Sequence, residues 1–281
     1  MIITPLEKEL LMAHVLKKSR EWVFAHPEIE LTKEQKEEFK SLVKRRENHE
    51  PIAYITNEKE FYGRKFYVDE RVLIPRPATE TLIDEVKRLF KTGLEKQRSI
   101  TKADNGIVIF TEIFKKKFSI FNFQFSFKNQ SSIANDKLMI LDIGTGSGCI
   151  GITLALEIPD TEIICTDISE DALKVAKQNV KAHNLLNRIK FLKSDLTEAE
   201  RGTRNAERYL AVSNPPYIPQ VDPNRDPLQP DVYNFEPHKA LFAGKDGTDL
   251  LTKLYKQCLN DPCCIGCVLE MHEEQAKKLT Q

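Results

Sequence analysis

Apolar positions near the start of the chain recur at the spacing of an amphipathic helix. Thr4 and Glu7 form a capping-box pattern, and the apolar residues after it fall on one face of a helix. Thr32 and Gln35 repeat the pattern ahead of a second apolar stripe. The sequence therefore predicts at least two helices in this region.

A short segment of aromatic residues follows these helices. Residues 61–68, FYGRKFYV, predict two strands that turn at Gly63. A Pro-Arg-Pro run at 75–77 ends this pattern, and apolar residues from 82 to 90 return to helical spacing. We predict an N-terminal helical domain with a short β-hairpin over residues 1–90.

The sequence changes character between residues 91 and 137. Three lysines at 115–117 adjoin a series of phenylalanines, and those at 121–127 alternate strictly with polar residues. This alternation favours a strand or a hairpin. We expect residues 91–137 to be an insertion packed on the surface; a basic and aromatic platform for nucleic acid is the alternative.

From residue 138 onward, apolar runs typical of strands alternate with helical patterns. This alternation predicts an α/β fold with a doubly wound, mostly parallel, Rossmann-like sheet. The predicted strands cover residues 139–141, 162–165, 189–192, 210–213 and 264–269. We assign residues 138–281 to this α/β domain.

Composition and charge restrict the classes of function. Of the 281 residues, 41% are hydrophobic and 30% are charged, as in globular proteins. The chain carries 42 basic and 42 acidic residues, a balance that argues against a dedicated nucleic-acid binder. No apolar run is long enough for a membrane span, and the first residues do not resemble a secretory signal. We expect a cytoplasmic protein with no membrane partner.

Six cysteines in a chain of this size do not indicate a disulfide scaffold. Cys264 and Cys267 form one C-x-x-C pattern, but a second pair at zinc spacing is missing. We interpret these cysteines as small apolar strand residues and predict no metal site.

A glycine-rich turn follows the first predicted strand of the α/β domain. Ligands bind at this end of a parallel sheet, where helix N-termini offer free N–H groups and glycines allow close approach. The candidate binding residues of the turn are Gly144, Thr145, Gly146, Ser147 and Gly148. With Gly151 the turn also satisfies the G-x-G-x-x-G spacing, so the turn alone allows a nicotinamide dehydrogenase equally well.

Three acidic residues lie at the carboxyl ends of neighbouring predicted strands. Asp142, just before the glycines, could hold the amino group of a ligand. Asp167 could accept both hydroxyl groups of a ribose. Asp195 is placed to meet adenine or its exocyclic amine, although acidic residues at such positions also often cap helices.

Asn214, Pro215, Pro216 and Tyr217 follow the fourth predicted strand. Two prolines would supply a rigid turn, but the motif has a more specific use. An amide nitrogen is a poor nucleophile because its lone pair is delocalised. Asn214 Oδ1 and the Pro215 carbonyl could accept the two hydrogens of this nitrogen. Tyr217 could cover the planar amide group. Methyl transfer from the sulfonium of S-adenosylmethionine (AdoMet) then depends on positioning and electrostatics, without a metal. A dehydrogenase has no use for this motif, so we predict an AdoMet-dependent methyltransferase.

Further motifs make the chain resemble one methyltransferase family. Asn-Pro-Pro-Tyr with the glycine turn is typical of amino-methyltransferases. Residues 50–55 (EPIAYI), 61–63 (FYG), 73–80 (LIPRPATE) and 235–241 (FEPHKAL) are similar to release-factor glutamine methyltransferases, the HemK/PrmC family. The resemblance covers about residues 4–90 and 138–275.

This resemblance implies N5-methylation of the glutamine in the Gly-Gly-Gln motif of class I peptide chain release factors. It implies also that the N-terminal domain docks this protein substrate and that Arg76 lines the cleft between the domains. Position by position, it assigns Gly144 to Gly148, Asp167 and Asn214 to AdoMet, Asn214 to Tyr217 to the glutamine, and Leu196, after Asp195, to the adenine. We expect a monomer that binds no nucleic acid.

The chain departs from the family in two places. Segment 91–137 stands where the family has a short connection, and the chain ends after the fifth predicted strand, where this sheet normally ends with an antiparallel strand pair. We therefore expect an exposed sheet edge. Two other functions stay open: an adenine-N6 methyltransferase acting on DNA or RNA, and a catalytically inactive binding module of the same fold.

Overall fold

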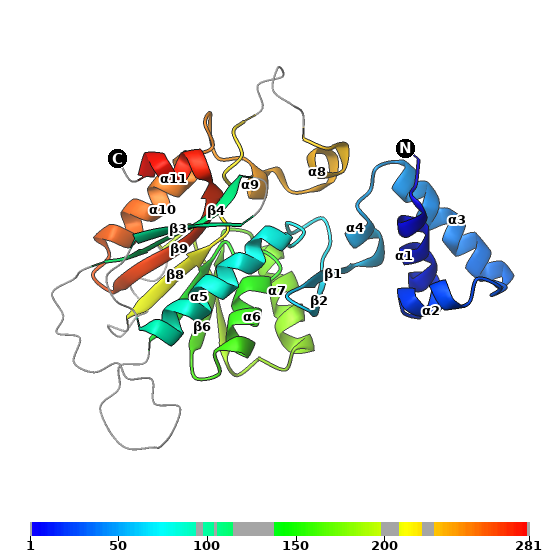
Figure 1. Cartoon of the computed structure of the whole chain (residues 1–281), viewed down its shortest axis with the longest axis horizontal. Helices are drawn as coiled ribbons and strands as arrows, with labels where there is room; N and C mark the ends of the chain where they lie inside the picture. The colour runs from blue at the N-terminus through cyan, green and yellow to red at the C-terminus, as the bar shows by residue number, and fades with distance from the viewer. Residues whose placement is uncertain are drawn as a thin grey trace.

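A mixed β-sheet forms the centre of the computed structural model, and helices cover both of its faces (Figure 1). The structure describes residues 2–93, 98–103, 106–114, 138–197, 208–220 and 228–279. Over these residues the sheet has seven strands in the order β3-β4-β9-β8-β5-β6-β7. The strands are β3 (Arg98–Lys102), β4 (Ile107–Ile113), β5 (Met139–Ile143), β6 (Glu162–Asp167), β7 (Ile189–Lys193), β8 (Tyr209–Ser213) and β9 (Cys264–His272).

The strands from β5 to β9 pair in parallel and confirm the predicted α/β class. Every residue of β5 and β8, the middle strands of this group, is buried. Parallel strands covered on both faces are apolar throughout rather than alternating. This is why continuous apolar runs predicted them.

A hairpin formed by β3 and β4 closes the other side of the sheet. β4 pairs antiparallel with β9, from Ile107 opposite His272 to Ile113 opposite Gly266. The expectation that residues 91–137 form a surface insertion is therefore wrong for β4, which is a buried strand of the sheet. The expected exposed edge at the fifth predicted strand is wrong as well, because β4 covers it.

The sequence of β4 explains this placement. Its residues IVIFTEI include Val108, Ile109 and Phe110, which are at most 1% exposed. Pairing with β9 buries these side chains and satisfies backbone groups that an open edge would leave free. The lysines at 115–117 and the alternating phenylalanines at 121–127 lie outside the described residues.

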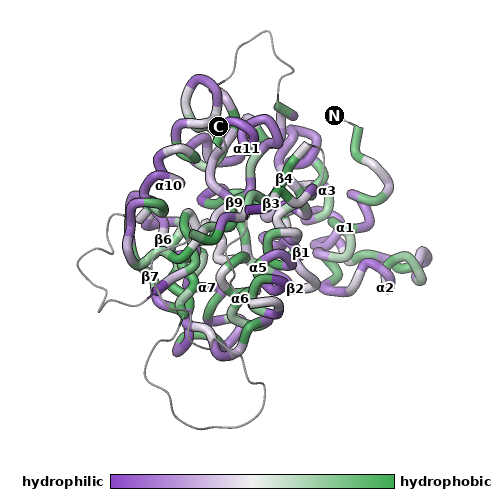
Figure 2. The backbone as a smooth tube through the Cα atoms, turned by 60° about the vertical axis from the view of Figure 1, so that its left-hand side comes forward, coloured by the Kyte–Doolittle hydropathy of each residue, from purple (hydrophilic) through white to green (hydrophobic). Residues whose placement is uncertain are grey.

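Two layers of helices bury the faces of the sheet. Side chains of α5, α6 and α7 form one apolar core with the sheet, and those of α10 and α11 form the other. Figure 2 shows hydrophobic residues gathered around β6 and α6 in the interior. These helices are α5 (Glu80–Thr92), α6 (Cys149–Glu157), α7 (Glu170–Ala182), α10 (Asp249–Asn260) and α11 (Glu273–Leu279).

The N-terminal helices lie at one end of the molecule (Figure 1). The capping boxes at Thr4 and Thr32 are both formed, as the sequence predicted. The predicted hairpin is present, and Gly63 occupies its turn with a φ of 68°. This region comprises α1 (Pro5–Leu16), α2 (Arg20–Ala25), α3 (Lys33–Glu47), α4 (Ile52–Thr56), β1 (Glu58–Phe61) and β2 (Arg64–Tyr67).

Three short helical elements lie near the Asn-Pro-Pro-Tyr motif, which follows β8, and one of them contacts the N-terminal helices. The 3-10 helix η1 covers Pro77–Thr79, and α8 (Pro230–Phe235) and α9 (His238–Leu241) follow the Asn-Pro-Pro-Tyr motif. Arg46 of α3 forms an ion pair of 3.6 Å with Asp231 of α8. None of the helices in the described ranges is both long and apolar enough to cross a membrane.

Candidate active site

The glycine turn joins the end of β5 to the start of α6. Gly144, Gly146 and Gly148 have φ angles of 68°, 54° and 82°, a region in which residues with a Cβ are strained. Gly148 caps α6, and a Cβ there would lie 3.1 Å from Ile152 Cδ1. The predicted turn is thus present, and its conformation requires glycine.

Asp142 lies directly beneath this turn. Its Oδ2 accepts hydrogen bonds from Thr145 Oγ1 at 2.6 Å and from the Gly151 N–H at 3.0 Å. Its Oδ1 is buried and has no hydrogen-bond partner among the described residues. Burial raises the pKa of this carboxyl group to about 6. A buried oxygen without a donor is suited to a cationic group of a ligand.

Asp167 ends β6 and contacts the same turn. Its Oδ2 accepts the Gly146 N–H at 3.0 Å, and its Oδ1 accepts the Ser169 N–H at 2.8 Å. Burial raises the pKa of this carboxyl group, and the backbone N–H groups of Ser169, Gly146 and Ile168 oppose the effect. The structure therefore places Asp142, Asp167 and the glycines together at one end of the sheet.

Asp195 and Leu196 follow β7. The Asp195 carboxylate is partly exposed and forms an ion pair of 2.7 Å with Lys253 of α10. Leu196 has a φ of 56° and packs against the core between the sheet and α10. Asp195 already has a cationic partner, and its role toward adenine stays a prediction.

The Asn-Pro-Pro-Tyr motif leaves the end of β8 beside the glycine turn. Ser213, just before the motif, donates a hydrogen bond of 2.6 Å to the carbonyl of Ile143, just before Gly144. Asn214 Nδ2 donates to Thr79 Oγ1 at 3.0 Å, so η1 meets the motif here. The structure thus brings Asn214 next to the predicted ligand-binding turn.

Tyr217 is held by residues of β9 and α11. Its hydroxyl donates to Glu270 Oε1 of β9 at 2.9 Å, and its carbonyl accepts Gln275 Nε2 of α11 at 2.8 Å. Its ring also packs edge-on against His272, with ring centroids 5.2 Å apart. These contacts fix both the backbone and the ring of Tyr217.

Two residues of this site escaped the sequence analysis. Glu270 is completely buried, and its Oε2 has no hydrogen-bond partner in the described structure. Burial raises the pKa of Glu270, whereas Thr79, Tyr217, Arg76 and Asn214 favour its charged form. An acidic residue inside the apolar run 264–271 was the available signal for Glu270; Thr79 gave no signal beyond its place in a motif.

Arg76 does not stand alone between its two prolines. Its Nη2 lies 2.5 Å from Glu236 Oε1, in an ion pair with a carboxylate side chain that is only 1% exposed. Glu236 Oε2 also accepts the Ile74 N–H at 3.2 Å. The segments 73–80 and 235–241, which resembled one family separately, are therefore joined by a buried contact.

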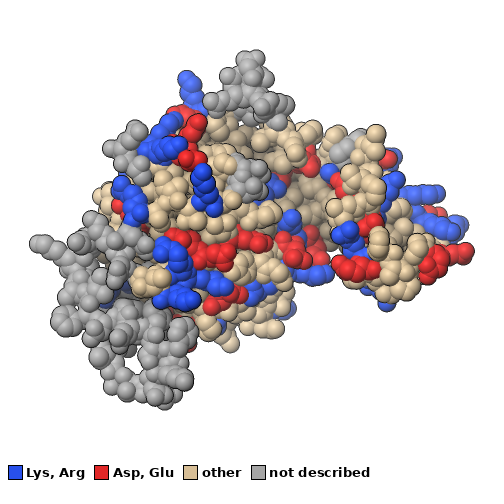
Figure 3. All heavy atoms as spheres, viewed as in Figure 1, with Lys and Arg blue, Asp and Glu red and all other residues tan. Residues whose placement is uncertain are grey.

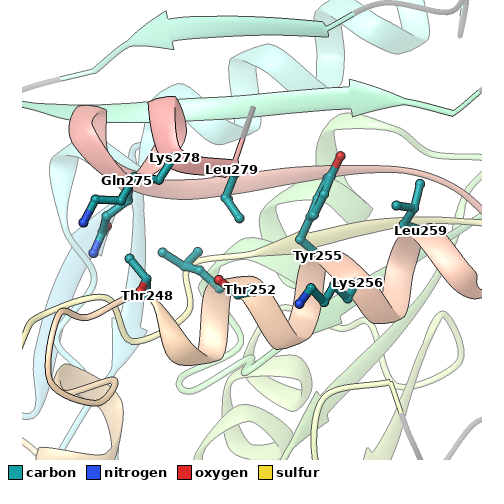
Figure 4. A pocket seen from close by; sticks show the side chains of 9 residues that line it. Thr248, Thr252, Tyr255, Lys256, Leu259, Gln275, Lys278 and Leu279 are labelled. Atoms are coloured by element: carbon teal, nitrogen blue, oxygen red, sulfur yellow. The ribbon is translucent and has the colours of Figure 1, made fainter. Parts of the chain in front are cut away.

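Figure 4 shows a groove between α10 and α11, on the helical layer rather than at the strand ends. It encloses about 290 Å³. Gln275, at one end of the groove, is the residue that binds the Tyr217 carbonyl. The groove is lined by Thr248, Leu251, Thr252, Tyr255, Lys256, Leu259, Gln275, Lys278 and Leu279.

On the face drawn in Figure 3, acidic and basic side chains are interspersed over the coloured part of the molecule. No group of three or more histidine, cysteine or acidic side chains that could hold a metal ion occurs in the described ranges. The cysteines of the C-x-x-C pattern are buried free thiols.

Comparison with known proteins identifies both parts of the chain. Residues 4–56 match the family described as PrmC N-terminal domain, and residues 129–226 match the methyltransferase small domain. The release factor glutamine methyltransferase of Chlorobaculum tepidum is 36% identical over 85% of this chain and 68% of that protein. The corresponding protein of Clostridium botulinum is 35% identical, over 90% of this chain and 74% of that protein.

Longer relatives match as well. A bifunctional methyltransferase of Rickettsia typhi is 38% identical over 98% of this chain, but the match covers only 48% of that protein. The chain therefore spans about half the length of these relatives.

Proposed function

The chain belongs to the family of the release factor glutamine methyltransferases, and on this premise we propose its activity. It transfers the methyl group of AdoMet to the side-chain amide nitrogen, N5, of the glutamine in the Gly-Gly-Gln motif of class I peptide chain release factors. The nitrogen gains the methyl group and loses one of its two hydrogens as a proton.

The residues around the glycine turn fit AdoMet. The buried Asp142 Oδ1, which has no donor of its own among the described residues, would accept the cationic amino group. Asp167 would accept the ribose hydroxyls while it holds the Gly146 N–H. Asp195 and Leu196 would flank the adenine. When bound, AdoMet supplies an activated methyl group on a positively charged sulfur.

The Asn-Pro-Pro-Tyr motif would hold the glutamine amide. Asn214 Oδ1 and the Pro215 carbonyl accept the two N–H hydrogens, which directs the nitrogen lone pair toward the methyl group. Pro215 and Pro216 carry no N–H donor that could compete for these acceptors. The Tyr217 ring, fixed by β9 and α11, covers the planar amide.

One observation carries this proposal: Asn214 Nδ2 donates to Thr79 at 3.0 Å, beside the glycine turn. In this arrangement the amino end of the carboxamide faces Thr79, and its oxygen is the end left to act as an acceptor. This is the orientation that an N–H substrate needs.

Arg76 is the residue we propose to contact the release factor outside the motif. Glu236 anchors its guanidinium, and the side chain is still 34% exposed. An anchored but accessible guanidinium suits recognition of carbonyl or carboxylate groups on a protein partner.

The decisive experiment is incubation with labelled AdoMet and either a class I release factor or nucleic acid. We expect label only on the release factor, and mass spectrometry should place a single methyl group on the glutamine of Gly-Gly-Gln. A release factor with alanine at this glutamine is the control and should stay unlabelled. Label found only on DNA or RNA would replace this proposal with an adenine-N6 methyltransferase.

A further inference from the structure

The two polar side chains of the Asn-Pro-Pro-Tyr motif are each held by a buried residue outside it. Thr79, 2% exposed, accepts from Asn214 Nδ2 at 3.0 Å. Glu270, completely buried, accepts from the Tyr217 hydroxyl at 2.9 Å. Thr79 belongs to η1 and Glu270 to β9, so two distant elements converge behind the motif.

The contact with Thr79 alone does not determine which way the Asn214 carboxamide points. The two ends of a carboxamide are nearly the same size, and a hydroxyl group can either donate or accept. If Thr79 donated to Asn214, the oxygen would face Thr79 and the amino group would face the substrate. Such an arrangement would present donors to an amide that itself needs acceptors.

Glu270 determines the direction of the hydrogen bond between Thr79 and Asn214. An ionised carboxylate only accepts hydrogen bonds. Its Oε2 is buried and has no partner among the described residues. Burial raises the pKa of Glu270, whereas the nearby Thr79, Tyr217 and Asn214 side chains favour the charged form of the carboxylate. The Thr79 hydroxyl can therefore turn its one proton toward Glu270. Its lone pairs then remain to accept from Asn214 Nδ2.

We propose that Glu270 and Thr79 are positioning residues for methyl transfer, which orient the Asn214 carboxamide so that Oδ1 faces the reacting nitrogen. This inference rests on the proposed function. Glu270 also fixes the ring of Tyr217, so one carboxylate organises both polar side chains of the motif.

The placement of Glu270 is costly for the fold alone. Val268, two positions earlier on the same face of β9, is apolar and completely buried, so an apolar side chain would suit this environment. A buried carboxylate is disfavoured unless it is hydrogen-bonded, and the bond that Glu270 Oε1 accepts comes from Tyr217, a residue of the site. A role in orienting the site accounts for the presence of the charge.

The test uses steady-state kinetics with a release factor. The wild-type chain must first methylate the glutamine; if it does not, the proposed function fails before the positioning roles are examined. Thr79→Val removes the hydroxyl at nearly constant volume, and we expect kcat to fall about 10- to 100-fold because the amide is no longer fixed. The dissociation constant for AdoMet and the Tm should change little. Thr79→Ser, which keeps the hydroxyl, should restore most of kcat.

Glu270→Gln tests the direction of the hydrogen bonds. Glutamine keeps the shape but offers one acceptor and one donor, so either Thr79 or Tyr217 loses its acceptor. We expect kcat to fall and the Tm to stay constant or rise, since a buried charge is removed. In the Asn214→Ala background, Thr79→Val should cause no further loss of kcat, because the group that it orients is absent.

Thr153→Val is the matched control, because Thr153 is a completely buried threonine of α6 outside this network. It should leave kcat unchanged. The proposal is overturned if Thr79→Val keeps kcat within twofold of the wild type, or if Thr79→Ser is as impaired as Thr79→Val. It is also overturned if the loss in Thr79→Val is matched by a loss of AdoMet binding or of Tm, which would indicate a purely structural role.

Discussion

Asp167 Oδ2 accepts a hydrogen bond of 3.0 Å from the backbone N–H of Gly146, 21 residues earlier in the chain. This bond joins the end of β6 to the turn that follows β5. The carboxylate proposed to bind the ribose therefore also fixes the shape of the turn that borders it. Loss of the side chain would weaken AdoMet binding both by removing the proposed ribose contact and by loosening the turn.

Asp167→Ala should weaken AdoMet binding by about 1.5 to 3 kcal/mol, the range for hydrogen bonds to a charged group. Isothermal calorimetry would measure the change. Asp171→Ala is the control, because this nearby carboxylate is exposed and pairs with exposed Lys174; it should bind AdoMet like the wild type. Equal affinities for the wild type and Asp167→Ala would contradict the ribose role.

The buried carboxyl group of Asp142 should make AdoMet binding depend on pH. Burial raises its pKa to about 6, and a cationic amino group beside Oδ1 would favour the charged form. Below about pH 6 the carboxyl group must release its proton on binding, so affinity should fall by up to about tenfold per pH unit. Asp142→Asn should bind more weakly at pH 8 and lose this part of the pH dependence. If the affinity of the wild type for AdoMet did not change between pH 7 and pH 5, this result would argue against the assignment.

Without AdoMet, the Asp142 carboxyl group should have the opposite pH dependence: it should make the folded chain less stable as the pH rises. Its folded-state pKa lies above the unfolded value, so its stabilising contribution is complete at low pH and is lost as the pH rises through about 6. Asp142→Asn removes the buried charge and keeps an acceptor for Thr145 and Gly151. We therefore expect a higher Tm than the wild type at pH 8, measured without AdoMet, and a difference that shrinks toward pH 4. A lower Tm at pH 8 would contradict this account.

The sequence predicted the parts of the site that depend on local pattern. The glycine turn was predictable because its backbone conformation requires glycine at 144, 146 and 148. The positions of Asp142 and Asp167 beside this turn were predictable because the carboxyl ends of neighbouring parallel strands meet at one edge of the sheet. The roles of Thr79 and Glu270 were not predictable. They depend on contacts of η1 and β9 with the motif, and these contacts join segments that are far apart in the sequence.

The hairpin of β3 and β4 was missed for a similar reason. Its apolar run is visible in the sequence, but pairing with β9 joins residues more than 150 positions apart. The strand pair was expected after the fifth strand, and the order of elements along the chain gave no indication that it would precede the glycine turn. Which strand fills an edge is decided by backbone pairing and burial in the folded sheet.

Asn214→Ala should reduce kcat by about 100-fold or more, since it removes an acceptor that acts on the reacting amide. AdoMet affinity should change little if the main role of the side chain is to hold the glutamine. Single-turnover transfer to a release factor and calorimetry with AdoMet would measure the two effects separately. Asn260→Ala, at the exposed end of α10, is the control and should be fully active. Retained turnover in Asn214→Ala would remove this residue from the mechanism.

Gly266 provides a direct test of the hairpin that completes the sheet. A Cβ at this position would lie 2.5 Å from the carbonyl oxygen of Glu112 and 2.6 Å from Ile113 Cδ1, so β4 would have to move away from β9. Gly266→Ala should therefore lower the free energy of unfolding by about 1 to 3 kcal/mol, as overpacking does, and Gly266→Val should lower it further. Denaturant unfolding would measure both changes, with Lys102→Ala, an exposed change on β3, as the control. Hydrogen exchange should become faster at the N–H groups of residues 107–113 in these variants. If Gly266→Val were as stable as the wild type, β4 could not pack against β9 at this position, and the sheet edge would be open as the sequence alone had suggested.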